Sequence, residues 1–133
     1  VYLKHELWMT LMKGYITVGT NNLARSAAFY EALFEELGFT RRREVADRAV
    51  YFGTEDDVQL VVITPADGQP ATAGNGTMVA LNVDAQEQVQ RLHARAMDLG
   101  AIDEGAPGPR GSDTFYGAYF RDPDGNKIAF YLR

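Results

Sequence analysis

The segment Arg121–Arg133, RDPDGNKIAFYLR, decides the fold of this chain. Its DPDGN portion has the composition of a tight turn, because proline presets φ for the second position and glycine or asparagine accepts positive φ. After the turn, Ile, Phe and Leu alternate with Lys127, Ala129 and Tyr131. This alternation predicts a strand with two different faces, one in the core and one available for function.

Length and charge restrict the class of protein. A chain of 133 residues suits one domain with a sizeable core. Its formal charge of −5 disfavours nucleic acid and anionic membrane partners, which select basic surfaces. Without cysteine it has no disulfide, thiolate nucleophile or cysteine metal site, which fits a cytoplasmic protein.

The first residues differ from the rest of the chain. Residues 1–11, VYLKHELWMTL, have neither the long apolar run of a membrane helix nor a signal-peptide cleavage pattern. We interpret them as an N-terminal extension before a single domain over 12–133. Trp8 of the extension can pack on this domain or on a partner chain.

The first half of the domain reads as a strand, a helix and three strands. GYITVGTNN (14–22) predicts a strand that ends at the helix N-cap Asn22, and Gly38 ends the helix. The apolar stripe of this helix is Leu23, Ala27, Tyr30, Leu33, Phe34 and Leu37. Strands are predicted at 39–45, 48–53 and 57–64.

The second half repeats this order after a Gly- and Pro-rich linker over 65–75. A strand over 76–84 precedes a capping box of Asp84 and Glu87, and the helix ends at Gly100. Its stripe is Val89, Leu92, Ala96 and Leu99. Weak strand signals follow near 101–105, then a predicted loop, DEGAPGPRGSD (103–113), then the closing hairpin.

The two halves align with each other. Gly14 placed on Gly76 brings Asn22 onto Asp84 without a gap. Neither half can close a core alone, since each has one amphipathic helix and one uncovered sheet face. We therefore expect two modules, about 14–64 and 76–133, that form a curved mixed sheet with helices outside and a concave pocket inside.

Three segments carry a family resemblance. They are ITVGTNNLARSAAFYEALFEELGF, GNGTMVALNVDAQEQVQRLHARAMDLGA and YGAYFRDPDGNKIAFY. The chain from Gly14 to its end resembles the vicinal oxygen chelate superfamily, which includes glyoxalase I, bleomycin-resistance proteins and extradiol dioxygenases. The resemblance implies an α+β fold of two βαβββ modules.

The resemblance also implies where a metal would bind. Enzymes of this superfamily hold one divalent metal with His, Gln or Glu from their first, fifth and eighth strands, and the matching positions here are Tyr15, Met78 and Ala129. None is an ordinary ligand for a hard or borderline cation. His5 lies in the extension, and His93 lies in the second helix off its apolar stripe, where we expect it in solvent. We predict no metal and no other cofactor.

Strand alternation predicts the pocket. Its residues are Tyr15, Thr17, Met78, Ala80, Asn82, Ala129 and Tyr131, with Phe115 or Tyr116 and Tyr119 near the mouth, depending on register. Aromatic rings offer stacking area and their hydroxyls orient a ligand. The first hypothesis is a metal-free small-molecule-binding protein and homodimer, whose ligand is aromatic or cationic. Whether one chain or a dimer forms the pocket stays open.

Two alternatives remain. The chain can be a lyase- or dioxygenase-like enzyme, with a non-standard metal site or with acid–base chemistry by Lys127, Tyr15, Tyr131 or Tyr116 if burial shifts a pKa. Arg110 on the predicted loop is then a lid or an anion contact, although no residue is assigned as catalytic. In the third hypothesis the pocket is filled by its own side chains, and an open cavity of a few hundred Å³ argues against it.

Overall fold

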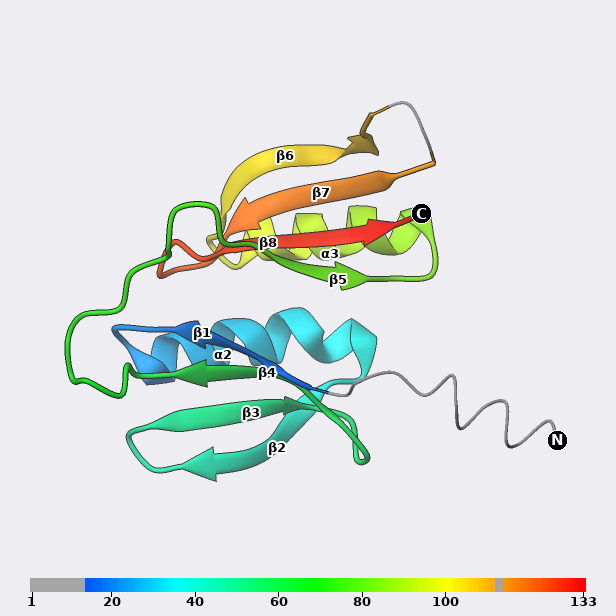
Figure 1. Cartoon of the computed structure of the whole chain (residues 1–133). Helices are drawn as coiled ribbons and strands as arrows, with labels where there is room; N and C mark the ends of the chain where they lie inside the picture. The colour runs from blue at the N-terminus through cyan, green and yellow to red at the C-terminus, as the bar shows by residue number, and fades with distance from the viewer. Residues whose placement is uncertain (1–13, 112–113) are drawn as a thin grey trace, which may run out of the picture.

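The computed structural model describes residues 14–111 and 114–133, which form two four-stranded sheets. Figure 1 shows the sheets side by side, with both helices on the same side of them. The predicted extension over 1–11 lies outside the described residues. None of the described helices is long and apolar enough to cross a membrane.

The first module has the order βαβββ. It begins with β1 (Ile16–Gly19), α2 (Leu23–Leu33) and the short 3-10 helix η1 (Phe34–Leu37). Its remaining strands are β2 (Thr40–Val45), β3 (Ala49–Gly53) and β4 (Val58–Ile63). The sheet order is β1-β4-β3-β2, with β1 parallel to β4 and the other pairs antiparallel.

The second module repeats this arrangement. Its elements are β5 (Val79–Asn82), α3 (Gln86–Asp98), β6 (Ile102–Pro109), β7 (Tyr116–Arg121) and β8 (Lys127–Leu132). The sheet order is β5-β8-β7-β6, and only β5 and β8 are parallel. The α+β fold of two βαβββ modules is therefore confirmed, and the connection between the two parallel strands of each module contains one helix and two strands.

The starts of the two helices differ, although the sequence aligns them. Asn22 caps α2 as predicted, because its side-chain oxygen accepts a hydrogen bond from the Arg25 N–H at 3.0 Å. The predicted capping box of Asp84 and Glu87 is wrong, since α3 begins one residue too late and has no side-chain cap. Instead, the Asp84 N–H donates to Oε1 of Gln88 at 2.9 Å.

The core lies between the helices and the sheets. Both predicted helical stripes face it, with Leu23, Leu37 and Leu99 partly buried at its margin. The largest fully buried side chains are Tyr30, Phe34, Phe52, Phe120, Phe130, Leu33, Leu60, Leu92 and Ile128. Both helical segments end as predicted, because Gly38 and Gly100 have φ of 74° and 95°, which glycine adopts without a Cβ clash.

His93 does not lie in solvent, contrary to the prediction. It is 7% exposed, and its Nε2 lies 3.0 Å from Oδ1 of Asp103 on the neighbouring strand β6. The Asp103 carboxylate also accepts the Gly105 N–H at 2.9 Å. That backbone hydrogen bond, and then the one with His93, lower the pKa of Asp103. His93 does lie off the apolar stripe of α3, as the sequence predicted. It is nevertheless buried, because β6 covers that side of the helix.

The predicted loop over 103–113 is also corrected. Strand β6 continues to Pro109 and pairs with β7, with two shifts in register. Bulges accommodate glycine and proline inside a paired strand, which explains why the composition resembled a loop. Most of this segment is therefore held in the sheet, and Arg110 follows directly after it.

The DPDGN turn joins the two modules. The Tyr30 hydroxyl of α2 donates to Oδ2 of Asp122 at 2.5 Å. The Asn126 side chain donates to the same oxygen at 3.0 Å and to the Gly19 carbonyl of β1 at 2.9 Å. Oδ1 of Asp124 accepts a backbone N–H just before α2 at 2.9 Å. These polar contacts hold the closing hairpin against the end of β1 and the start of α2.

Candidate functional site

The surface of the sheets opposite the helices, called here the open face, carries most of the predicted pocket residues. Figure 1 looks onto it, with the helices behind. In the second sheet, Ala80, Ala129 and Tyr119 are register partners across β5, β8 and β7. Asn82 and Tyr131 are partners in the next row. Register therefore places these residues on one surface.

Tyr116 is a correction to the predicted pocket. Its ring packs against the core, and its hydroxyl accepts a hydrogen bond from the Gln90 side chain of α3 at 2.9 Å. In β7, Tyr116 therefore shares the helix-facing side with Ala118 and Phe120, which are 1% and 0% exposed. Phe115 is the aromatic residue that reaches Tyr131.

A cavity of about 370 Å³ lies where the edges of β1 and β5 meet, and we call it the junction cavity. Two predicted residues, Thr17 and Met78, line it together with Lys127. Its complete lining is Ile16, Thr17, Val18, Gly19, Thr72, Ala73, Gly74, Thr77, Met78, Val79, Asn126 and Lys127. Both modules and the linker between them therefore form this site.

Lys127 connects the junction cavity to the second sheet. It is half-buried, and its Nζ lies 5.4 Å from the centre of the Tyr119 ring. Arg110 approaches the same ring, with its Cζ at 5.3 Å from the centre. An aromatic face attracts cations at this distance. Lys127 is thus held against the sheet and is not a freely solvated residue after a turn.

A stacked pair of rings lies further along β8. The centres of the Phe115 and Tyr131 rings are 5.3 Å apart and their planes differ by 7°. Gly117 makes room for this pair, because a Cβ there would lie 2.9 Å from the Phe115 ring. The stack occupies part of the open face with the protein's own side chains.

Small residues form the floor between these aromatic groups. Gly105, Tyr119, Ala129 and Ala80 form one row across the second sheet. Ala129 is 1% exposed even though it lies on the open face. Neighbouring larger side chains therefore cover it, so the row is closed at Ala129.

Arg110 lies directly after β6 and beside Tyr119. Its guanidinium donates to the carbonyls of Ala106 and Pro109 at 2.5 and 3.2 Å. These bonds hold the side chain against the end of β6. Arg110 is therefore fixed beside Tyr119, and its role as a lid or anion contact stays a prediction.

The first sheet also carries a cluster of Tyr15, Tyr51 and Arg43, of which only Tyr15 was predicted as a site residue. Tyr15 is 55% exposed, and its ring centre lies 6.1 Å from that of Tyr51. Arg43 lies over the Tyr51 ring at 5.3 Å. Tyr51 and Arg43 come from antiparallel strands that pair only in the folded chain.

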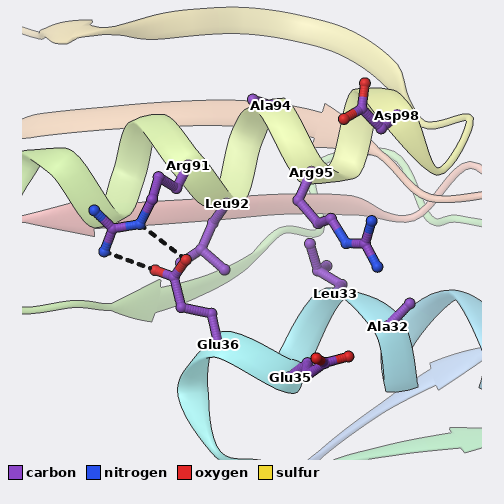
Figure 2. A pocket seen from close by; sticks show the side chains of 9 residues that line it. All are labelled: Ala32, Leu33, Glu35, Glu36, Arg91, Leu92, Ala94, Arg95 and Asp98. Carbon is purple, nitrogen blue, oxygen red and sulfur yellow. Dashed lines mark hydrogen bonds and ion pairs between the residues drawn. The ribbon is translucent and has the colours of Figure 1, made fainter.

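A larger groove, about 440 Å³, lies on the helix side between the modules. Figure 2 shows its lining from α2, η1 and α3, with Arg91 facing Glu36. The Arg91 Nε and Nη2 atoms donate to the two Glu36 carboxylate oxygens at 2.9 and 3.0 Å. This hydrogen bond raises the pKa of the Arg91 guanidinium. The groove is spanned by an ion pair that links the modules, and no residue predicted for the site lies in it.

The fold and this site can now be compared with known proteins. The family model described as Glyoxalase/Bleomycin resistance protein/Dioxygenase superfamily matches residues 14–130. The chain belongs to this superfamily. No curated protein matches the sequence.

Several solved structures share this fold. A glyoxalase/bleomycin resistance protein from Albidiferax ferrireducens T118 is 34% identical, with a TM-score of 0.79, over 93% of this chain and 99% of that chain. Hypothetical protein SA1046 from S. aureus is 25% identical, with a TM-score of 0.68, over 93% and 99%. Fosfomycin resistance protein FosX from Mesorhizobium loti, at 19% identity and a TM-score of 0.67 over 94% of both chains, shows the fold alone.

The metal site that this superfamily implies does not fit the residues present. Tyr15 is exposed beside Tyr51, Met78 offers a thioether, and Ala129 offers no donor atom. Among residues 14–111 and 114–133, no three His, Asp or Glu side chains are grouped to hold a metal ion. His93 is paired with Asp103 on the helix side. We therefore derive no chemistry through a metal.

Sequence patterns missed the part of the site that the linker provides. Thr72, Ala73 and Gly74 line the junction cavity, although 65–75 read only as a connection. A composition of Gly, Ala, Pro and Thr signals a loop but says nothing about what the loop touches. The nearest available signal was the concentration of small residues, which permits close approach to a ligand.

Proposed function

We propose that this chain binds a small organic molecule in the junction cavity without a resident metal ion. The observation that carries the proposal is the substitution pattern around the cavity. Positions that hold metal ligands in relatives carry Tyr15, Met78 and Ala129, while Thr17 and Met78 line a cavity of about 370 Å³. Ligand sites commonly occupy about 300–1,000 Å³.

The cavity lining supports ligand binding over the hypothesis that the protein's own side chains fill the pocket. It combines apolar surface from Val18, Met78 and Val79 with hydroxyls from Thr17 and Thr77. A few polar groups within an apolar wall orient a ligand while burial supplies affinity. The stacked Phe115 and Tyr131 rings fill space along β8, but they are not part of the cavity lining.

A blocking variant tests the proposal. A thermal-shift screen of small aromatic compounds identifies binders, whose affinities are then measured by calorimetry. Thr17→Trp places a large ring in the cavity and is expected to weaken binding by about tenfold or more. Val45→Trp, at another exposed β-branched position on the outer strand β2, is the matched control and should leave affinity unchanged. Equal binding by both variants, or a screen without binders, contradicts the proposal.

We also propose that the chain is a homodimer. Tyr15 and Met78 are 55% and 43% exposed, and large exposed apolar side chains favour a covering partner. A specific interface of more than about 1,000 Å² is expected. Light scattering at micromolar concentration measures the mass, and the mass of one chain would contradict this.

A further inference from the structure

We infer that the ligand of the junction cavity is an aromatic carboxylate whose acid group pairs with Lys127. This inference rests on the proposed function and names its ligand class. It reverses the expectation of a cationic ligand, which came from the net charge of the chain. Four observations support it: the charges lining the cavity, the surroundings of Lys127, a second cation nearby, and the apolar lining of the cavity.

The cavity lining carries one ionisable group. Of its twelve lining residues only Lys127 is charged, and none is an Asp or Glu. Hydroxyls from Thr17, Thr72 and Thr77 and the amide of Asn126 complete its polar groups. A formal charge of −5 spread over the whole surface does not set the potential inside one cavity. The local field therefore favours an anion.

Lys127 has no ion-pair partner among the described residues. Glu104 of β6 is bound by the Arg121 guanidinium at 2.5 Å. That hydrogen bond, and more weakly the charge of Lys127, lower the pKa of Glu104. Lys127 and Arg121 are also direct partners across β8 and β7, and like charges at such positions destabilise a sheet. Glu104 therefore attracts Lys127 but forms its salt bridge with Arg121, which leaves the Lys127 ammonium able to pair with a ligand anion.

Arg110 adds a second positive charge. Lys127 Nζ and Arg110 Cζ lie 5.4 and 5.3 Å from the centre of the same Tyr119 ring. The guanidinium of Arg110 donates only to the carbonyls of Ala106 and Pro109 within the described chain, so no carboxylate neutralises it there. Two cations held on one ring form an electropositive group beside the cavity.

The apolar lining next to Lys127 suits a flat ring. Ile16 of β1, with Met78 and Val79 of the second module, lines the same cavity as Lys127. A ring that extends from an acid group at Lys127 into the cavity would lie against these side chains. Burial of the ring there supplies affinity, while the acid group fixes its orientation.

Calorimetry with four probes tests the inference. Benzoate carries the ring and the anion, benzyl alcohol the ring alone, benzylamine the ring and a cation, and inorganic phosphate the anion alone. Each is titrated into wild type, Lys127→Gln and Lys127→Arg. Arg95→Gln is the control, because it removes the same charge from the helix-side groove.

Benzoate should bind most tightly of the four probes. Lys127→Gln should weaken benzoate about tenfold or more, while Lys127→Arg and Arg95→Gln stay within about threefold of wild type. The inference is overturned if Lys127→Gln binds benzoate unchanged, if benzylamine binds better, or if phosphate binds as tightly as benzoate. If benzyl alcohol binds and Thr17→Trp blocks it while benzoate does not bind, the proposed function stands and this inference fails. If no probe binds, the inference also fails, and the thermal-shift screen decides the proposed function separately.

Discussion

The hydrogen bond between Tyr30 and Asp122 gives a quantitative prediction about how the modules hold together. Tyr30 is 0% and Asp122 2% exposed, and the hydroxyl donates to Oδ2 of a carboxylate from the other module. In Tyr30→Phe this oxygen keeps only the Asn126 side chain as a donor, at 3.0 Å. A lost hydrogen bond to a buried charged group costs about 1.5–3 kcal/mol.

The expected loss is therefore about 2 kcal/mol in the free energy of unfolding. For 133 residues the unfolding entropy is about 0.28 kcal/mol/K, so Tm should fall by about 7 °C. Urea unfolding and a thermal scan measure both quantities. Tyr116→Phe is the matched control, because its hydroxyl bonds the exposed Gln90 and its loss should cost under about 0.5 kcal/mol.

A double-mutant cycle separates this contact from general packing. Tyr30→Phe and Asp122→Asn should couple by about 1 kcal/mol or more if the two groups bond each other. The reasoning is refuted if Tyr30→Phe costs no more than Tyr116→Phe, or if the two substitutions are additive. Either result would mean that apolar burial alone joins the modules.

Three further predictions follow from the same structure. Burial, and then Asp122, raise the pKa of Tyr30 well above its usual value, so the folded chain retains a proton that the unfolded chain loses above about pH 10. The contribution of Tyr30 to the free energy of unfolding should therefore be fully present below that pH and be lost as the pH rises above it. Urea midpoints measured against pH should accordingly fall less steeply in Tyr30→Phe than in wild type. Phe130 lies on the core side of β8, so Phe130→Ala should lower the free energy of unfolding by about 3–5 kcal/mol. Ala129 lies on the open face, so Ala129→Trp should lower it by only about 1–3 kcal/mol. If urea unfolding shows the larger loss for Ala129→Trp, the two faces of β8 are misassigned. Purified protein should carry no stoichiometric Zn, Fe, Mn or Ni by elemental analysis, whereas about one tightly held equivalent per chain would show that other residues replace the missing ligands.

The sequence by itself determined the order of the elements and the two faces of those with a regular pattern. Period-two alternation around Ala129 and helical spacing around Tyr30 depend only on local geometry, so they predicted β8 and α2 correctly. The internal repeat and the identity of the residues at the metal positions are also properties of the chain alone. Together with the family resemblance, they predicted the fold and the poor fit of a metal before any contact was known.

Only the tertiary structure decided the contacts between segments that are distant in sequence. It buried His93 beneath β6, exchanged Tyr116 for Phe115 on the open face, and placed Lys127 against Tyr119. It also made the linker part of the cavity lining and placed the DPDGN turn in contact with α2. Strand register, bulges and module docking set these contacts, and each depends on packing across the whole chain. Local patterns cannot carry that information, because the same stretch of residues is compatible with several partners until the core is assembled.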